Sequence, residues 1–136
     1  MAETIHVEAR IAATPDRVWE VVGDVADVAA WIPAIESSRL EGDVRHATFA
    51  GGGGDARERI ESKDDAGRTY TYSYLDGPLA LERYSSTITV LADGDGSLVT
   101  WDAAFAAGSA AEEAELRAGI TGIYEGALAE LARQLG

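Results

Sequence analysis

The fold is decided by residues 109–136, SAAEEAELRAGITGIYEGALAELARQLG, the longest helical pattern in this 136-residue chain. Ser109 and Glu112 form a capping box, in which each side chain satisfies a free backbone donor at the start of a helix. Apolar side chains then recur every three or four residues, which places them on one helical face. They are Leu116, Ile120, Ile123, Ala127 and Leu131. Because the segments before this helix are mostly strand-like, the apolar face is expected to pack against a sheet.

Three glycines, Gly119, Gly122 and Gly126, follow one border of this apolar face. Each glycine inside a helix costs about 1 kcal/mol relative to alanine, so some other interaction must offset the loss. One interpretation is a close approach of the helix to the sheet. The other is that the missing side chains leave volume for a ligand.

Seven segments show the period-two alternation or β-rich composition of strands. They are residues 4–12, 35–42, 44–50, 55–63, 68–76, 82–92 and 97–107. Turn residues separate the later segments, which predicts sequential hairpins and an antiparallel sheet. Two short helices are expected after the first strand, one capped by Thr14 with Pro15 in its first turn, the other running from Asp24 to about Trp31 before Pro33.

These elements predict an α+β helix-grip fold, in which a curved antiparallel seven-stranded sheet wraps around one long C-terminal helix. The expected domain is single and covers residues 1–136, a size that buries about two-thirds of the surface of the unfolded chain. In such a protein the space between the sheet and the helix is where a ligand is expected to bind.

Composition excludes several classes of function. The net charge of −13 disfavours nucleic acids and anionic membrane surfaces as partners, because both are bound through excess Lys and Arg. There is no cysteine, and His6 and His46 lie on separate strands without the spacing of a metal site, so no metal and no cofactor is expected. No membrane span and no signal peptide are expected, and the predicted location is cytoplasmic.

Alternation assigns side chains to the two faces of each strand. In residues 55–63 the set containing Arg57 and Arg59 is charged, so Glu58 is expected to face the interior. In residues 68–76 the bulk of the aromatic rings indicates that Tyr72 and Tyr74 face inward, and in residues 82–92 the apolar set contains Tyr84 and Ser86.

A carboxylate beside phenols in an apolar cleft is suited to general acid or base chemistry, since burial raises the pKa of a carboxyl group. The alternative is that Glu58 only stabilises the fold, by pairing with Arg45 or by accepting hydrogen bonds from tyrosines. In residues 97–107 alternation favours Trp101 as buried, whereas a reversal by strand curvature would turn Asp102 inward instead.

Several short motifs resemble those of the START-like, or SRPBCC, superfamily, and most of all the bacterial polyketide cyclase/dehydrase family within it. The motifs are residues 13–19, Trp31-Ile32-Pro33, Glu58-Arg59-Ile60 and Asp64-Asp65. The resemblance covers almost the whole chain and implies the helix-grip fold. It does not select an activity, because the superfamily includes cyclases, lipid carriers and hormone receptors.

Residues 58–86 also resemble the plant abscisic acid receptors. In those receptors the ligand cavity is lined by the residues that match Phe49, Glu58, Tyr72, Tyr74, Tyr84, Ser86 and Ile123. The lysine that holds the hormone carboxylate is matched here by Ile32, and the gate loop by the glycines at 51–54. The resemblance therefore implies a neutral or weakly polar ligand rather than abscisic acid.

The predicted function is binding of a small hydrophobic molecule, aromatic or polyketide-like, with cyclase or dehydratase chemistry at Glu58 left open. The tyrosines Tyr72, Tyr74 and Tyr84 favour an extended or polycyclic ligand, because their rings offer wide apolar faces. The alternatives are a carrier without chemistry and a protein-interaction module that uses the outer face of the sheet. The expected ligand-binding residues are Trp31, Arg45, Phe49, Glu58, Tyr72, Tyr74, Leu81, Tyr84, Ser86, Gly119, Ile120, Ile123 and Ala127.

Overall fold

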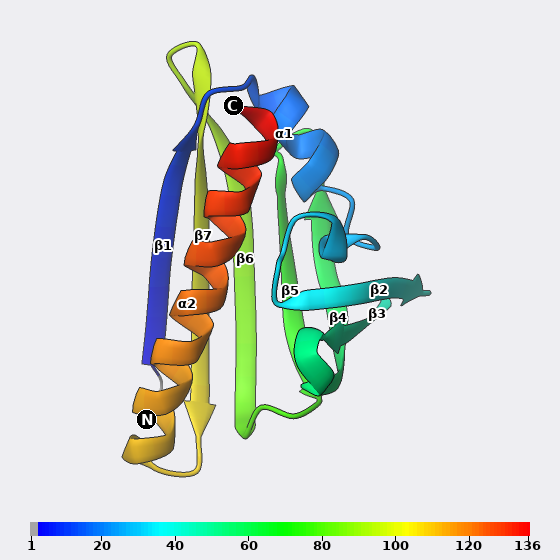
Figure 1. Cartoon of the computed structure of the whole chain (residues 1–136), viewed down its shortest axis with the longest axis vertical. Coiled ribbons are helices and arrows are strands. Elements are labelled where there is room, and N and C mark those ends of the chain that lie inside the picture. The colour runs from blue at the N-terminus through cyan, green and yellow to red at the C-terminus, as the bar shows by residue number, and fades with distance from the viewer. Residues whose placement is uncertain (1–2) are drawn as a thin grey trace.

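The computed structural model describes residues 3–136 and contains one seven-stranded sheet and one long helix (Figure 1). The expected domain, 1–136, starts with two residues that lie outside the described part. The elements are β1 (Glu3–Ile11), α1 (Pro15–Val22), η1 (Val28–Ala30), β2 (Ile35–Glu41), β3 (Val44–Phe49), η2 (Ala50–Gly52), β4 (Gly54–Asp64), β5 (Thr69–Asp76), β6 (Leu81–Asp93), β7 (Gly96–Ala107) and α2 (Ala110–Leu135). This order confirms the predicted fold, and each strand bound lies within one residue of its prediction.

The sheet is antiparallel throughout, in the order β1-β7-β6-β5-β4-β3-β2. Figure 1 shows α2 lying along β1, β7 and β6, whereas β2 and β3 run across the view at a steep angle to them. The sheet therefore curves around one side of the helix. The core fills this concave side, and its largest fully buried side chains include Trp31, Trp101, Tyr70, Phe105 and Leu128.

Helix α2 begins as the capping box predicts. The Ser109 hydroxyl accepts a hydrogen bond from the Glu112 backbone N–H at 3.2 Å. The buried face includes Ile120, Ala127 and Leu131, as expected, but it is wider than predicted because Tyr124 and Leu128 are also buried. A stripe that follows both the three- and the four-residue spacings covers these positions as well.

The two short segments after β1 differ from each other. Thr14 caps α1 by accepting from the Arg17 backbone N–H at 3.2 Å, with Pro15 in the first turn. The second segment is a single 3₁₀ turn, η1, whose N-cap is Asp27 and whose cap forms no side-chain hydrogen bond. The prediction that Asp24 caps this second helix was therefore wrong.

The faces of the strands follow the predicted alternation. Trp101 is buried and Asp102 is exposed, which resolves the ambiguity in β7 in favour of the aromatic set. On the outer face His6 contacts Asp102 and Glu8, at 2.5 and 2.7 Å, instead of being simply solvated. In the part of the chain that the structure describes, no helix has the length and apolar character needed to cross a membrane.

The surroundings of the three helix glycines test the interpretation of a close approach to the sheet, whereas the interpretation of volume for a ligand stays a prediction. Gly119, Gly122 and Gly126 are exposed, and a Cβ built on any of them meets no described atom within 4 Å outside the nearby helix backbone. The interpretation of a close approach to the sheet was therefore wrong. The glycines face open space on the outer border of α2.

We expect Gly122→Ala to raise the free energy of unfolding by about 1 kcal/mol, because alanine loses less backbone entropy and meets no clash. Thermal unfolding monitored by circular dichroism measures the effect. Gly96→Ala is the control that should destabilise, since its Cβ would lie 2.8 Å from the Ile11 carbonyl oxygen. A fall in the melting temperature of Gly122→Ala would contradict the open surroundings.

Candidate functional site

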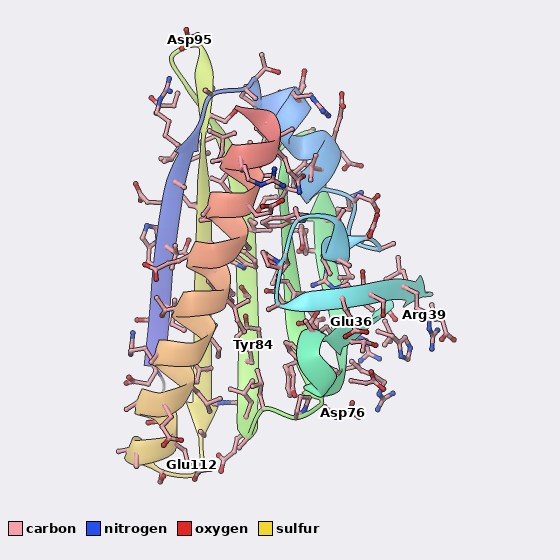
Figure 2. The ribbon with its side chains drawn as sticks, viewed as in Figure 1. Glu36, Arg39, Asp76, Tyr84, Asp95 and Glu112 are labelled. Carbon is pink, nitrogen blue, oxygen red and sulfur yellow. The ribbon has the colours of Figure 1, made fainter. Side chains whose placement is uncertain are left out.

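A pocket lies between the concave side of the sheet and α2, where the fold predicted it. Its free volume is about 50 Å³. The walls are Ile32, Ile35, Arg45, Phe49, Glu58, Tyr72, Tyr74, Leu79, Leu81, Tyr84, Trp101, Ile120, Ile123 and Tyr124. Figure 2 labels Tyr84 on β6, and its hydroxyl contacts that of Tyr124 on α2. The pocket is therefore closed at its base by side chains that meet across the sheet–helix interface.

Most of the residues predicted for the site are in these walls. The nine that line the pocket are Arg45, Phe49, Glu58, Tyr72, Tyr74, Leu81, Tyr84, Ile120 and Ile123. Ser86 is buried directly behind the phenols, and Trp31 packs behind Trp101 with 5.4 Å between ring centroids. Ala127 is buried farther along α2, and Gly119 lies on a shallow groove beside the pocket. These four residues do not line it.

Five lining residues were not predicted, namely Ile32, Ile35, Leu79, Trp101 and Tyr124. The signal for Tyr124 was present, because it lies four residues after Ile120 on the face that meets the sheet. Trp101 was expected to be buried but was not assigned to the site. Leu79 lies between β5 and β6, where no periodicity indicates which way a side chain points.

The aromatic side chains pack against one another rather than around an open space. The rings of Trp101 and Tyr124 are stacked, with centroids 3.9 Å apart and an angle of 6° between planes. The Tyr72 and Tyr84 hydroxyls are 3.3 Å apart. An apolar cavity of about 150 Å³ accommodates benzene. Even a single ring therefore needs the lining to move, and the polycyclic ligand that the three tyrosines favour needs a larger movement.

The polar part of the pocket is a buried ion pair. Arg45 is 2% exposed, and its Nε and Nη2 both lie 2.9 Å from Oε1 of Glu58. Arg45 also donates through Nη1 to the Val25 carbonyl oxygen at 3.0 Å and to the Tyr70 hydroxyl at 3.3 Å. Its guanidinium carbon lies 4.8 Å from the centre of the Tyr72 ring. Glu58 therefore pairs with Arg45, as one alternative expected, while a role of Glu58 in chemistry stays a prediction.

The second carboxylate oxygen of Glu58, Oε2, has a different environment from Oε1. Within residues 3–136, Oε2 has no hydrogen-bond partner, and Glu58 is one of the pocket walls. An ionised carboxylate only accepts hydrogen bonds. Glu58 therefore presents a free acceptor at the pocket while its other oxygen holds Arg45.

The phenols stay protonated at physiological pH. Burial raises the pKa of Tyr72 to about 12, and the charge of nearby Glu58 acts in the same direction. Burial likewise raises the pKa of Tyr84 and of Tyr124 well above the ordinary 10.0. These hydroxyls act in the pocket as neutral groups that both donate and accept hydrogen bonds.

Two loops flank the pocket. Between β3 and β4, Gly51, Gly52 and Gly54 adopt φ of 70°, 76° and 98°, a region that favours glycine. Between β5 and β6, the Leu79 backbone N–H donates to the Tyr74 hydroxyl at 3.0 Å. A Cβ at Gly54 would lie 3.5 Å from Pro78, so the two loops approach each other. The expected role of the glycine run as a gate stays a prediction.

A curved sheet that grips a C-terminal helix around a pocket is the helix-grip fold. Residues 2–136 match the model of the family described as polyketide cyclase / dehydrase and lipid transport, and the chain belongs to this family. The resemblance found in the short motifs is thereby confirmed. No curated protein sequence matches the chain.

Solved structures show the same fold. The protein XoxI from Bacillus cereus is 33% identical, with a TM-score of 0.87 over 98% of this chain and 94% of that one. A solution structure from Thermobifida fusca is 26% identical, with a TM-score of 0.86 over 98% and 93%. Norcoclaurine synthase from Thalictrum flavum, in complex with dopamine and hydroxybenzaldehyde, is 20% identical, with a TM-score of 0.77 over 98% and 86%. This last likeness shows the fold alone.

Proposed function

We propose that this protein binds a small hydrophobic molecule with one aromatic ring in the pocket between the sheet and α2, with a movement of the lining that enlarges the free volume of about 50 Å³. The observation that carries the proposal is the pocket wall itself, which is mostly apolar and aromatic around a single buried ion pair. Sites for small molecules have this composition, with few polar groups that orient the ligand. The family description, which includes cyclases and lipid transport, supports ligand binding of this kind.

The charges favour a neutral ligand over a carboxylate. Among the described residues that line the pocket, Arg45 is the one cation, and Glu58 already pairs with it. The net charge of −13 repels anions further. We therefore expect 4-methylphenol to bind more tightly than 4-methylbenzoate, which has a similar size and shape.

Titration calorimetry with 4-methylphenol tests the proposal. Ile123 lines the pocket from α2, so Ile123→Trp should fill it and abolish saturable binding. Ala118→Trp places the same ring on an exposed position of α2 and should bind as the wild type does. Equal binding by Ile123→Trp and the wild type would show that the ligand lies elsewhere.

Proton transfer by Glu58 is a second candidate function, favoured by its unpartnered Oε2 at the pocket. A carboxylate in this position acts as a general base on a carbon acid bound beside it. We expect the wild type to exchange the α-protons of 4-hydroxyphenylacetone in D₂O above the buffer rate, as followed by NMR. Glu58→Gln keeps an oxygen that accepts from Arg45; it should be less stable than the wild type, but where it is folded it should bind this ketone and exchange at the buffer rate. Exchange that is no faster with the wild type than with buffer would leave a carrier without chemistry.

Two expectations from the sequence stay predictions. They are the cytoplasmic location and the assignment of residues 1–136 to a single domain.

A further inference from the structure

Four hydroxyl groups form one continuous chain behind the pocket. The Tyr72 hydroxyl lies 3.3 Å from that of Tyr84, which contacts that of Tyr124, and the Tyr124 oxygen lies 2.8 Å from Ser86 Oγ. Ser86 Oγ in turn lies 3.2 Å from the backbone oxygen of Asp102. The chain thus runs from the pocket wall to the backbone of β7.

The end of this chain fixes its direction. A carbonyl oxygen only accepts, so the hydrogen in the last contact comes from Ser86, whose hydroxyl has no second hydrogen to give. Tyr124 must then donate to Ser86, Tyr84 to Tyr124, and Tyr72 to Tyr84. Four hydroxyl hydrogens fill the four contacts in this direction, whereas the opposite direction leaves the contact with Asp102 without a hydrogen. The raised pKa values of Tyr72, Tyr84 and Tyr124 keep all the hydrogens in place.

Trp101 reinforces this direction from the other side. Its indole Nε1 donates to Ser86 Oγ at 3.0 Å and faces the Tyr72 hydroxyl at 3.3 Å. Since an indole N–H can only donate, Tyr72 accepts there and directs its own hydrogen to Tyr84. The hydroxyl hydrogens of Tyr72 and Tyr84 are therefore both used inside the protein, and only their oxygen lone pairs remain for the pocket.

The Arg45–Glu58 ion pair also offers a hydrogen-bond acceptor to the pocket. Arg45 is held by Glu58, Val25 and Tyr70, whereas Oε2 of Glu58 has no partner within residues 3–136. The oxygens of Tyr72 and Tyr84 and Oε2 of Glu58 thus offer acceptors to the pocket, whereas the Tyr74 hydroxyl accepts from the Leu79 backbone N–H and keeps its own hydrogen. Acceptors therefore predominate among these groups. A ligand that supplies a donor forms a hydrogen bond with such an acceptor, whereas a ligand without a donor leaves this hydrogen bond unmade.

We propose that the pocket selects ligands that donate a hydrogen bond from a single ring, a neutral phenol above all, over ethers and ketones of the same shape. This inference rests on the proposed function, because it assigns the ligand class of the same pocket. Ser86 acts as a positioning residue, since it sets the direction of the hydroxyl chain without lining the pocket.

The first test compares 4-methylphenol with 4-methylanisole by titration calorimetry on the wild type. The ether keeps the ring and the oxygen but has no hydrogen to donate. One hydrogen bond corresponds to about a tenfold difference in Kd, so the phenol should bind about tenfold more tightly. Equal affinities, or tighter binding of the ether, would overturn the inference and leave the proposed function standing. Failure of both compounds and of 4-methylbenzoate to bind would overturn the proposed function and the inference together.

The second test uses variants that free one hydroxyl hydrogen of the chain, so that it can be donated to a ligand. Ser86→Ala removes the acceptor for Tyr124, so one hydroxyl hydrogen of the chain becomes free to turn toward the pocket. The affinity for 4-methylanisole should then rise about tenfold. Tyr124→Phe frees the hydrogen of Tyr84 and should act in the same way, which keeps the test valid if one variant fails to fold. Ser85→Ala, on the outer face of the same strand, should bind both compounds as the wild type does. An ether affinity that stays unchanged in Ser86→Ala and Tyr124→Phe would contradict the assigned direction.

Discussion

Arg45→Met is expected to lower the free energy of unfolding by about 3–5 kcal/mol, the usual cost of removing one partner of a buried ion pair. Methionine fills a similar volume but leaves Glu58 without its cation and the Val25 carbonyl oxygen without the Arg45 donor. Burial alone would lower the pKa of Arg45, but Tyr70 and Glu58 outweigh it and raise that pKa, so the arginine stays charged. Urea unfolding at neutral pH measures the loss.

A matched control separates burial from charge. Arg57 on the neighbouring strand pairs with Asp76, but both side chains are about half exposed, so Arg57→Met should change stability little. The double variant Arg45→Met/Glu58→Leu should recover much of the loss, because no uncompensated charge remains. If Arg45→Met cost no more than Arg57→Met, the buried ion pair would not contribute to stability as the structure implies.

The second large effect is a loss of stability at alkaline pH. A tyrosine whose pKa is raised in the folded state stabilises fully below the unfolded value of 10.0 and loses that contribution as the pH rises through the folded value. For Tyr72, with a folded pKa of about 12, the loss amounts to about 3 kcal/mol across this window. Tyr84 and Tyr124 act in the same direction. Unfolding free energy should therefore fall steeply above about pH 10.

Urea unfolding at a series of alkaline pH values measures this effect, with tyrosinate absorbance followed in parallel. The Tyr72→Phe variant should be less stable at neutral pH, where it lacks the hydrogen bond to Tyr84, but its stability should depend less on alkaline pH. Ionisation of every tyrosine near pH 10 without unfolding would show that the phenols are accessible to solvent.

The fold was predictable because its signals are periodic and local. The capping box at Ser109 and the apolar spacing after it predicted the 26-residue helix α2. Strict alternation predicted which residues of β4, β5 and β6 face the core. The second short helix was less predictable, since Asp24 and Asp27 are both residues suited to an N-cap and Asp27, which occupies it, makes no side-chain capping hydrogen bond. The glycines of α2 led to a wrong expectation of close contact with the sheet. Their free-energy cost is intrinsic to the helix, and no described atom lies close enough to them to explain it.

The site was predictable only in part. Alternation placed Glu58, Tyr72 and Tyr84 in the pocket wall, but it carries no information about how far apart their side chains end. The contact between the Tyr84 and Tyr124 hydroxyls joins residues 40 positions apart and fills space that the sequence suggested for a ligand. No sequence pattern predicts the orientation of the Leu79 side chain, because loops lack the periodicity of helices and strands.

The central claim is that the pocket between the sheet and α2 is where a one-ring ligand binds. Mapping of ¹H–¹⁵N chemical shifts during titration with 4-methylphenol tests it directly. The account predicts saturable changes that concentrate on Leu79, Tyr84, Ile120 and Ile123, with little change at Thr71 and Thr87 on the outer face of the sheet. Changes centred on Thr71 and Thr87, or no saturable change at all, would contradict it.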